Sequence, residues 1–148
     1  MKPVNTIGVL EQLRQMRERT VNELTGQLAR QKQLCQRYIN NINSLNALCH
    51  DGLLQNQGAV ERMNQMHYKA NIQRVIAWQE QEQALADMRA RELQADLTVE
   101  ACREKTVDLV LLQQREALAK ARGAQEQKNT DGLALQSWLR NRNNRRKR

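Results

Sequence analysis

The longest stretch without a helix breaker runs from residue 59 to residue 122, which contains neither Gly nor Pro. It is rich in Ala, Leu, Glu, Gln, Arg and Met, the strongest helix formers, and no period-two alternation indicates a strand. The stretch predicts one helix about 95 Å long, at roughly 1.5 Å rise per residue. Since a small domain is about 30 Å across, a compact fold cannot wrap such a helix, and we expect a rod.

A second helix is predicted over residues 6–50, with Asn5 or Thr6 as its N-cap after Pro3. Gly26 interrupts it mildly, at a cost of about 1 kcal/mol relative to Ala. Its apolar residues alternate by three and four positions, as in a heptad seam. The seam positions are Val21, Leu24, Leu28, Gln31, Cys35, Tyr38, Ile42, Leu45 and Cys49. Upstream, Arg14 and Arg17 fall on the seam while Leu10, Leu13 and Met16 follow a neighbouring row, so we expect that end to be looser.

Residues 51–58 contain two glycines and separate the two helical stretches. A short connection between long helices makes them antiparallel neighbours. The predicted fold is therefore all-α, an antiparallel two-helix coiled-coil hairpin with a longer second helix. The hairpin would occupy residues 1–139, with the second helix over about 59–139. Residues 140–148 form a basic tail that is predicted to be disordered. Gly123 and Gly132 are places where the last part of the second helix is expected to kink or fray.

The predicted helices differ in length. A bend centred on residue 55 places Leu10 opposite Glu100, so the first helix would run out near residue 103. The second helix would then leave several apolar side chains without a partner in the chain, namely Val107, Leu109, Val110, Leu111, Leu112 and Leu118. Apolar groups exposed over such a length usually form a binding surface. Two interpretations stay open: self-association, or insertion into a groove or pore of another protein.

Charge and composition exclude several functions. The formal net charge is +8, but the last nine residues carry six basic groups and no acid, which leaves +2 for the body. A body of that charge is not a nucleic-acid-binding surface. His50 and His67 are isolated, and the chain has no Gly-rich phosphate loop. We therefore predict no catalytic site, no metal and no cofactor.

Three sparse cysteines do not suggest a disulfide scaffold, and no apolar run reaches the length of a membrane span. The residues near the N-terminus also lack the uninterrupted apolar core of a secretory signal. The cysteine pattern and the lack of such apolar segments favour a reducing, cytoplasmic location. Two alternative functions remain for a chain of this kind. One is a basic nucleic-acid-associated coiled coil, and the other is a self-associating structural coiled coil.

The residues also resemble a family. Three stretches are similar to stretches of the flagellar type III export protein FliJ family. They are Gln31 followed by Tyr38-Ile39-Asn40-Asn41-Ile42, the patch of Tyr68, Ile72, Val75 and Gln79, and the run Glu126-Gln127-Lys128-Asn129-Thr130-Asp131-Gly132-Leu133-Ala134. The resemblance spans nearly the whole chain. Cys35 and Ile42 stand where larger groups are typical, Gly132 replaces an acid, and the Arg-rich tail is longer than usual.

The resemblance implies a non-enzymatic, stalk-like adaptor of the flagellar export apparatus, without a small-molecule substrate. Its implied partners are the hexameric export ATPase, whose assembly it promotes, the cytoplasmic domain of the export gate, and export chaperones. These partners would hold it at the cytoplasmic face of the inner membrane. The gate-contact candidates are Gln31, Tyr38, Tyr68, Ile72 and Gln79. The ATPase-ring candidates, from the expected docking segments 1–20 and 103–139, are Leu10, Leu13, Val107, Leu111, Leu118, Lys128 and Asp131.

Overall fold

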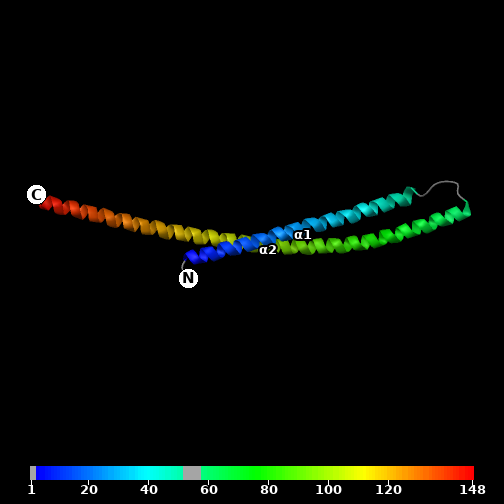
Figure 1. The fold of residues 1–148 in the computed structure, drawn as a ribbon, viewed down its shortest axis with the longest axis horizontal. Coiled ribbons are helices and arrows are strands. Elements are labelled where there is room, and N and C mark those ends of the chain that lie inside the picture. The colour runs from blue at the N-terminus through cyan, green and yellow to red at the C-terminus, as the bar shows by residue number, and fades with distance from the viewer. Residues whose placement is uncertain (1–2, 52–57) are drawn as a thin grey trace. The chain divides into compact units, whose positions relative to one another are not determined.

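The computed structural model describes residues 3–51 and 58–148, which form two helices and no strand (Figure 1). Helix α1 spans Pro3–Asp51 and helix α2 spans Ala59–Arg146. The predicted fold class is confirmed: the chain is an all-α, antiparallel two-helix hairpin whose second helix is the longer. Most of the predicted bend lies outside the described residues.

The helix ends differ from those expected. Pro3 is the first residue of α1, where its fixed φ suits a helix and its missing N–H is not needed, so Asn5 and Thr6 lie inside the first turn. At the start of α2, the Arg62 backbone N–H donates to the Gly58 carbonyl oxygen at 3.0 Å, the first bond of the helical ladder. At its other end α2 continues through both late glycines to Arg146, and the disorder of residues 140–148 in the free chain stays a prediction.

Contacts divide the chain into two compact units. The bend unit comprises Arg19–Cys102, and the terminal unit comprises Met1–Glu18 with Arg103–Arg148. Each unit contains part of α1 and part of α2, and each is described separately.

The bend unit contains most of the buried apolar side chains. The predicted seam of α1 is confirmed, because Leu28, Cys35 and Ile42 are buried and the other seam positions from Val21 to Cys49 are half-buried. Most of the buried and half-buried positions of α2 in this unit also alternate by four and three: Ile72, Ile76, Gln79, Gln83, Ala86, Ala90, Leu93, Leu97 and Glu100. Ile42, Ile72 and Ile76 form one cluster, against which Leu45 and Cys49 pack. Two matching heptad rows therefore hold this unit together.

The register of the bend unit is shifted from the one predicted. Ile42 meets Ile72 and Ile76, and the Gln31 side-chain amide donates to the Ala86 carbonyl oxygen at 3.0 Å. Both pairings are symmetric about a position near Gly58, the residue before α2, and not about residue 55. A count from the middle of the Gly-containing segment misses this shift.

The terminal unit corrects the predicted overhang. Glu11 binds Arg115 at 2.6 Å, and Arg14 lies 4.0 Å from Asp108, whereas the symmetric count put Leu10 opposite Glu100. The start of α1 therefore covers a stretch of α2 that was expected to be bare. Leu111 is only 2% exposed, and Val107 and Leu118 are half-buried, while Leu109, Val110 and Leu112 are exposed. The prediction that Leu111 lacks a partner was wrong.

The second helix still outlasts the first within the terminal unit. Every side chain from Ala119 to Arg148 is exposed, and Figure 1 shows the orange-to-red part of α2 continuing beyond the start of α1. We call residues 119–148 the extension. It begins later along the chain than the sequence predicted, and its large apolar side chains are different ones: Leu133, Leu135, Trp138 and Leu139.

Candidate interaction surfaces

The five gate-contact candidates lie in the bend unit, but the fold does not bring them to one exposed face. Ile72 is 7% exposed and belongs to the core cluster. Gln31, Tyr38 and Gln79 occupy half-buried seam positions. Only Tyr68 is largely exposed, at 54%. The patch inferred from the sequence is therefore mostly the interior of the hairpin, with Tyr68 at its edge.

The two glutamines of this set sit at polar positions of an otherwise apolar interface. The Gln31 amide is held by its bond to the Ala86 carbonyl, and the small Ala86 side chain leaves room for that close approach. The Gln79 side-chain oxygen is buried and has no hydrogen-bond partner. A buried acceptor without a donor costs about 1–3 kcal/mol, so Gln79 weakens the seam at its own position.

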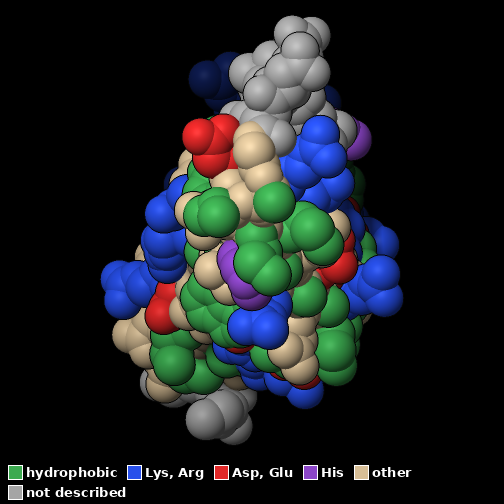
Figure 2. Space-filling model, turned by 90° about the vertical axis from the view of Figure 1, so that its right-hand side faces the viewer, with side chains coloured by type: hydrophobic (Ala, Val, Ile, Leu, Met, Phe, Trp, Pro, Cys, Tyr) green, Lys and Arg blue, Asp and Glu red, His purple; other side chains and the backbone are tan. Residues whose placement is uncertain are grey.

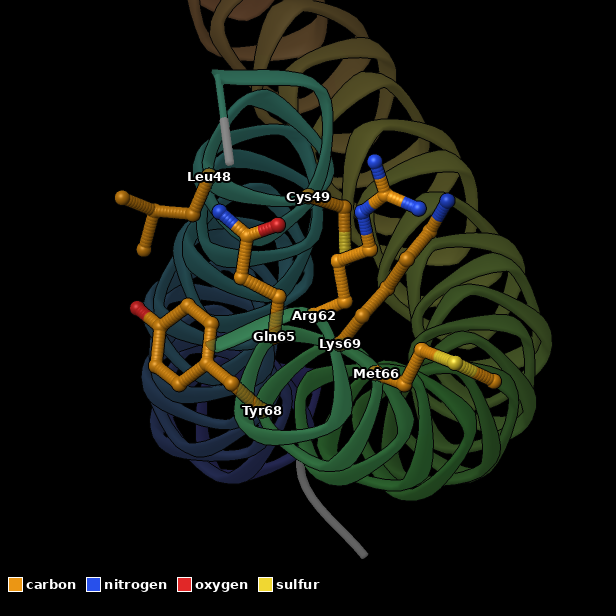
Figure 3. A pocket seen from close by; sticks show the side chains of 7 residues that line it. All are labelled: Leu48, Cys49, Arg62, Gln65, Met66, Tyr68 and Lys69. Atoms are coloured by element: carbon orange, nitrogen blue, oxygen red, sulfur yellow. The ribbon is translucent and has the colours of Figure 1, made fainter. Parts of the chain in front are cut away.

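A pocket that was not predicted from the sequence opens between the helices next to the bend (Figure 3). It has a volume of about 460 Å³. Continuing the α2 heptad row back from Ile72 reaches Lys69, Gln65 and Arg62, which are long polar residues. Such side chains do not close onto the facing α1 residues Leu48 and Cys49 as Ile72 and Ile76 close onto Ile42. A run of polar residues at seam positions was the sequence signal for this opening.

The surface around this pocket is apolar with a basic edge. Val60, Met63 and Met66 are each more than 60% exposed, and Leu48 is about half exposed. In Figure 3 the Arg62 and Lys69 side chains run together on one side of the pocket, with Leu48 and Tyr68 on the other. Figure 2, which looks toward the bend, shows hydrophobic side chains exposed between basic ones. Methionine-rich surfaces adapt to more than one partner shape, so this end of the bend unit suits protein contact better than catalysis.

The seven ATPase-ring candidates lie in the terminal unit, but they divide into two groups. Leu10, Leu13, Val107, Leu111 and Leu118 are buried or half-buried where α1 packs on α2. Lys128 and Asp131 are exposed on the extension, and the Gln127 amide donates to the Asp131 carboxylate at 2.9 Å. Only the second group is presented to a partner without opening the hairpin.

Charged side chains occupy part of the helix interface in the terminal unit. Glu11 accepts from Arg14 at 3.1 Å and from Arg115 at 2.6 Å, and Arg14 lies on the seam beside Asp108. All four groups retain about a third or more of their side-chain exposure, so solvent screens these pairs and each contributes less than about 1 kcal/mol. The pairs set the register of the two helices more than they stabilise them.

The end of the extension combines large apolar side chains with arginines. The Arg142 guanidinium lies over the Trp138 ring, 5.3 Å from its centroid. A surface concavity of about 390 Å³ is lined by Trp138, Asn141, Arg142, Arg145 and Arg146. This site is cationic and aromatic, so it favours anions and apolar groups.

One thiol in the core of the bend unit has a shifted pKa. Burial, followed by the hydrogen bond and negative charge of Asp87, raises the pKa of the Cys35 thiol. Among residues 3–51 and 58–148, no group of three His, Cys, Asp or Glu residues is placed to hold a metal ion. Neither helix, over its described residues, has a stretch apolar and long enough to cross a membrane.

A helical hairpin with heptad-spaced packing and exposed apolar patches is typical of coiled-coil interaction proteins. Within this class, the family model of the Flagellar FliJ protein matches residues 7–143, so the chain belongs to that family. The resemblance found in the sequence is thereby confirmed, and the chain is a coiled-coil protein of a family related to flagellar export. Comparisons with curated proteins and with solved structures gave no match.

Proposed function

We propose that this chain is a stalk-like adaptor that docks its terminal unit in the ring of the flagellar export ATPase and promotes assembly of that ring. The same adaptor links the ring to the cytoplasmic domain of the export gate and to export chaperones. It acts in the cytoplasm, at the cytoplasmic face of the inner membrane, where its partners hold it.

The extension carries this proposal. Residues 119–148 are helical through Arg146, yet none of their side chains is covered by α1. A helix with no tertiary packing is only marginally stable in water, because most helical stability in proteins comes from burial of one face. A partner that surrounds the helix would supply that burial, and the central opening of a hexameric ring has the required geometry.

The test is stimulation of purified flagellar export ATPase by the full-length chain. The variant that ends at Lys120 removes most of the extension and leaves the packed part of the terminal unit intact. We expect it to lose stimulation and ring assembly, while its thermal unfolding midpoint stays within a few degrees of that of the full chain. Full stimulation by this shortened chain would contradict ring docking through the extension.

A second variant, ending at Leu139, is the matched control for charge. It removes the six basic groups of the last nine residues and keeps Lys128, Asp131 and the apolar side chains of the extension. Docking in the ring predicts that it retains most of the stimulation at physiological salt. Loss of stimulation equal to that of the shorter variant would indicate nonspecific attraction to the basic tail.

Contact with the gate is proposed through the exposed side of the bend unit, where Tyr68 and Val75 are accessible, and not through the buried Ile72. Tyr68→Ala should weaken binding to the purified gate domain about tenfold without changing ATPase stimulation. Equal gate binding by wild type and Tyr68→Ala would remove this residue from the contact.

The two alternative functions are tested with the same protein. Sedimentation at increasing concentration should show a monomer, because an adaptor that docks in a ring does not bury its extension against a second copy. Binding of duplex DNA that disappears with residues 140–148 and falls steeply with salt would support the nucleic-acid alternative instead.

A further inference from the structure

The last part of the extension has two chemically different sides. One side of the helix carries apolar residues followed by arginines, namely Leu135, Trp138, Leu139, Arg142 and Arg146. Their successive spacings of three, one, three and four residues keep them on the same side. Gln136, Ser137, Asn141, Asn143 and Asn144 fall on other sides. Leu133 lies opposite Leu135, at two residues' separation on a helix of 3.6 residues per turn. We call the first set the Trp138 face.

The apolar members of the Trp138 face are fully available. Trp138 is 56% exposed, and neither Leu135 nor Leu139 is covered by any other part of the described chain. They lie directly before a run of six basic groups in nine residues that contains no acid. A helix that presents Leu and Trp on one face beside Arg is typical of segments that lie in a membrane interface.

The arginines are placed to bind phosphate. Arg142, Arg145 and Arg146 line the concavity beside Trp138, and Arg142 lies against the indole ring. A tryptophan suits the depth of the lipid headgroups, because its ring is apolar and its N–H remains polar. Arginine keeps its guanidinium near the phosphates while its aliphatic stem lies along the apolar surface.

We propose that the Trp138 face binds the surface of an anionic lipid bilayer, with Leu135, Trp138 and Leu139 entering the interface and the arginines at its phosphates. Charge complementarity selects this occupant, since no acid lies between Leu139 and Arg148. Single-stranded nucleic acid is less well matched, because stacking needs several aromatic side chains and Trp138 is the only one in the extension.

This inference goes beyond docking in the ATPase ring, where no direct lipid contact is needed. Residues 135–139 cannot occupy the ring and the bilayer at once. The chain would therefore have a membrane-held state and a ring-docked state, and anionic vesicles should lower the stimulation of the ATPase.

The experiment uses the full chain with Trp78→Phe, which leaves Trp138 as its only tryptophan. Vesicles of phosphatidylglycerol and phosphatidylethanolamine are compared with vesicles of phosphatidylcholine alone. We expect the Trp138 emission to shift to shorter wavelength with the anionic vesicles only. No shift, or an equal shift with phosphatidylcholine, would overturn the proposal.

Matched variants separate insertion from plain attraction. The partition coefficient of the chain on anionic vesicles should fall at least tenfold in the variant Leu135→Asp, and also in the double variant Arg142→Glu and Arg146→Glu. In Leu133→Asp, on the opposite side of the helix, the same coefficient should change less than twofold. Equal losses from Leu133→Asp and Leu135→Asp would contradict a specific face. Loss with the Arg variants alone would show surface attraction without insertion, and also overturn the proposal.

A competition experiment tests whether the arginines bind the phosphates of nucleic acid instead of those of lipid headgroups. A single-stranded oligonucleotide added at the same phosphate concentration should not displace the chain from the vesicles. Displacement would overturn the lipid assignment in favour of nucleic acid. The vesicle assay contains no ATPase, so its failure leaves ring docking standing, and failure of ATPase stimulation leaves lipid binding standing.

Discussion

Among the described residues of the bend unit, the buried side chains are all apolar, and they recur on both helices from Leu28 to Ile42 and from Ile72 to Leu93. The terminal unit has a single buried side chain among its described residues, Leu111, together with an ion-pair network around Glu11. Beyond Leu118 it has no buried or half-buried side chain at all.

The difference separates stability from recognition. The bend unit packs an apolar core of its own between the two helices, although Val60, Met63 and Met66 beside its pocket stay exposed. The terminal unit leaves Leu135, Trp138 and Leu139 in water, and a partner or a surface must supply the missing burial. Neighbouring residues on the same helix allow each side of this comparison to be tested with a matched control.

The largest effect is expected in the core cluster of the bend unit. Ile76→Ala should lower the free energy of unfolding by about 2–4 kcal/mol, because it removes buried methyl groups and leaves a cavity against Ile42. Val75→Ala, one residue earlier and 43% exposed, should cost less than about 1 kcal/mol. Urea unfolding followed by circular dichroism measures both. Equal losses would mean that the cluster is not the source of stability.

A similar pair tests the terminal unit. Leu111→Ala should destabilise the packing of residues 104–118 by about 2–3 kcal/mol, and Leu112→Ala, which is 54% exposed, should cost less than about 1 kcal/mol. Hydrogen exchange of residues 104–118 measures this local loss of stability. If Leu112→Ala exchanged faster than Leu111→Ala, the register of the terminal unit would be wrong.

The cysteines test the burial of the seam within the bend unit, which contains both Cys35 and Cys102. The raised pKa and burial of Cys35 keep it a thiol, so at pH 8 it should react with a thiol reagent at least tenfold more slowly than exposed Cys102. In the unfolded chain the Cys35 thiol has its ordinary pKa of about 9, so above that pH it ionises more readily in the unfolded chain than in the folded one. The contribution of the buried thiol to the free energy of unfolding is therefore present below about pH 9 and is lost as the pH rises above that value. Labelling followed by mass spectrometry resolves the two sites. Equal rates in the folded chain would contradict the buried seam.

The smallest effect is expected for the ion pairs. Arg115→Ala removes the 2.6 Å contact to Glu11, yet both side chains are substantially exposed. The loss should stay below about 1 kcal/mol and should vanish at 1 M salt, where the screening length is about 3 Å. Lys120→Ala, an exposed cation on the same helix, is the control. A loss of several kcal/mol would show that charge, and not Leu111, holds the terminal unit.

The heptad seam of α1 was predictable from the sequence because apolar residues at alternating spacing leave few other solutions for a helix. The register was not predictable, because nothing between Asp51 and Ala59 states which residue is the point of symmetry. That error made Leu111 look unpartnered. Arg14 and Arg17 concealed the continuation of the seam, since charged residues at interface positions resemble the end of a coiled coil.

The interaction surfaces were predicted less well than the fold. Residues such as Ile72 and Gln31 carry the family resemblance, but one sequence does not distinguish a core position from a contact position. The pocket beside Arg62 and Lys69 depends on polar residues that fail to close an interface, which the apolar pattern alone does not indicate. The extension was predicted in kind, and only its start and its apolar residues had to be corrected.

The central claim is that α2 is packed up to Leu118 and unpartnered beyond it. Hydrogen exchange of the free chain and of the chain with the export ATPase tests this directly. In the free chain we expect slow exchange of the amides of residues 104–118 and fast exchange of those of residues 119–146. Addition of the ATPase should slow the exchange of residues 119–146. Equal protection of both segments in the free chain, or no change with the ATPase, would contradict it.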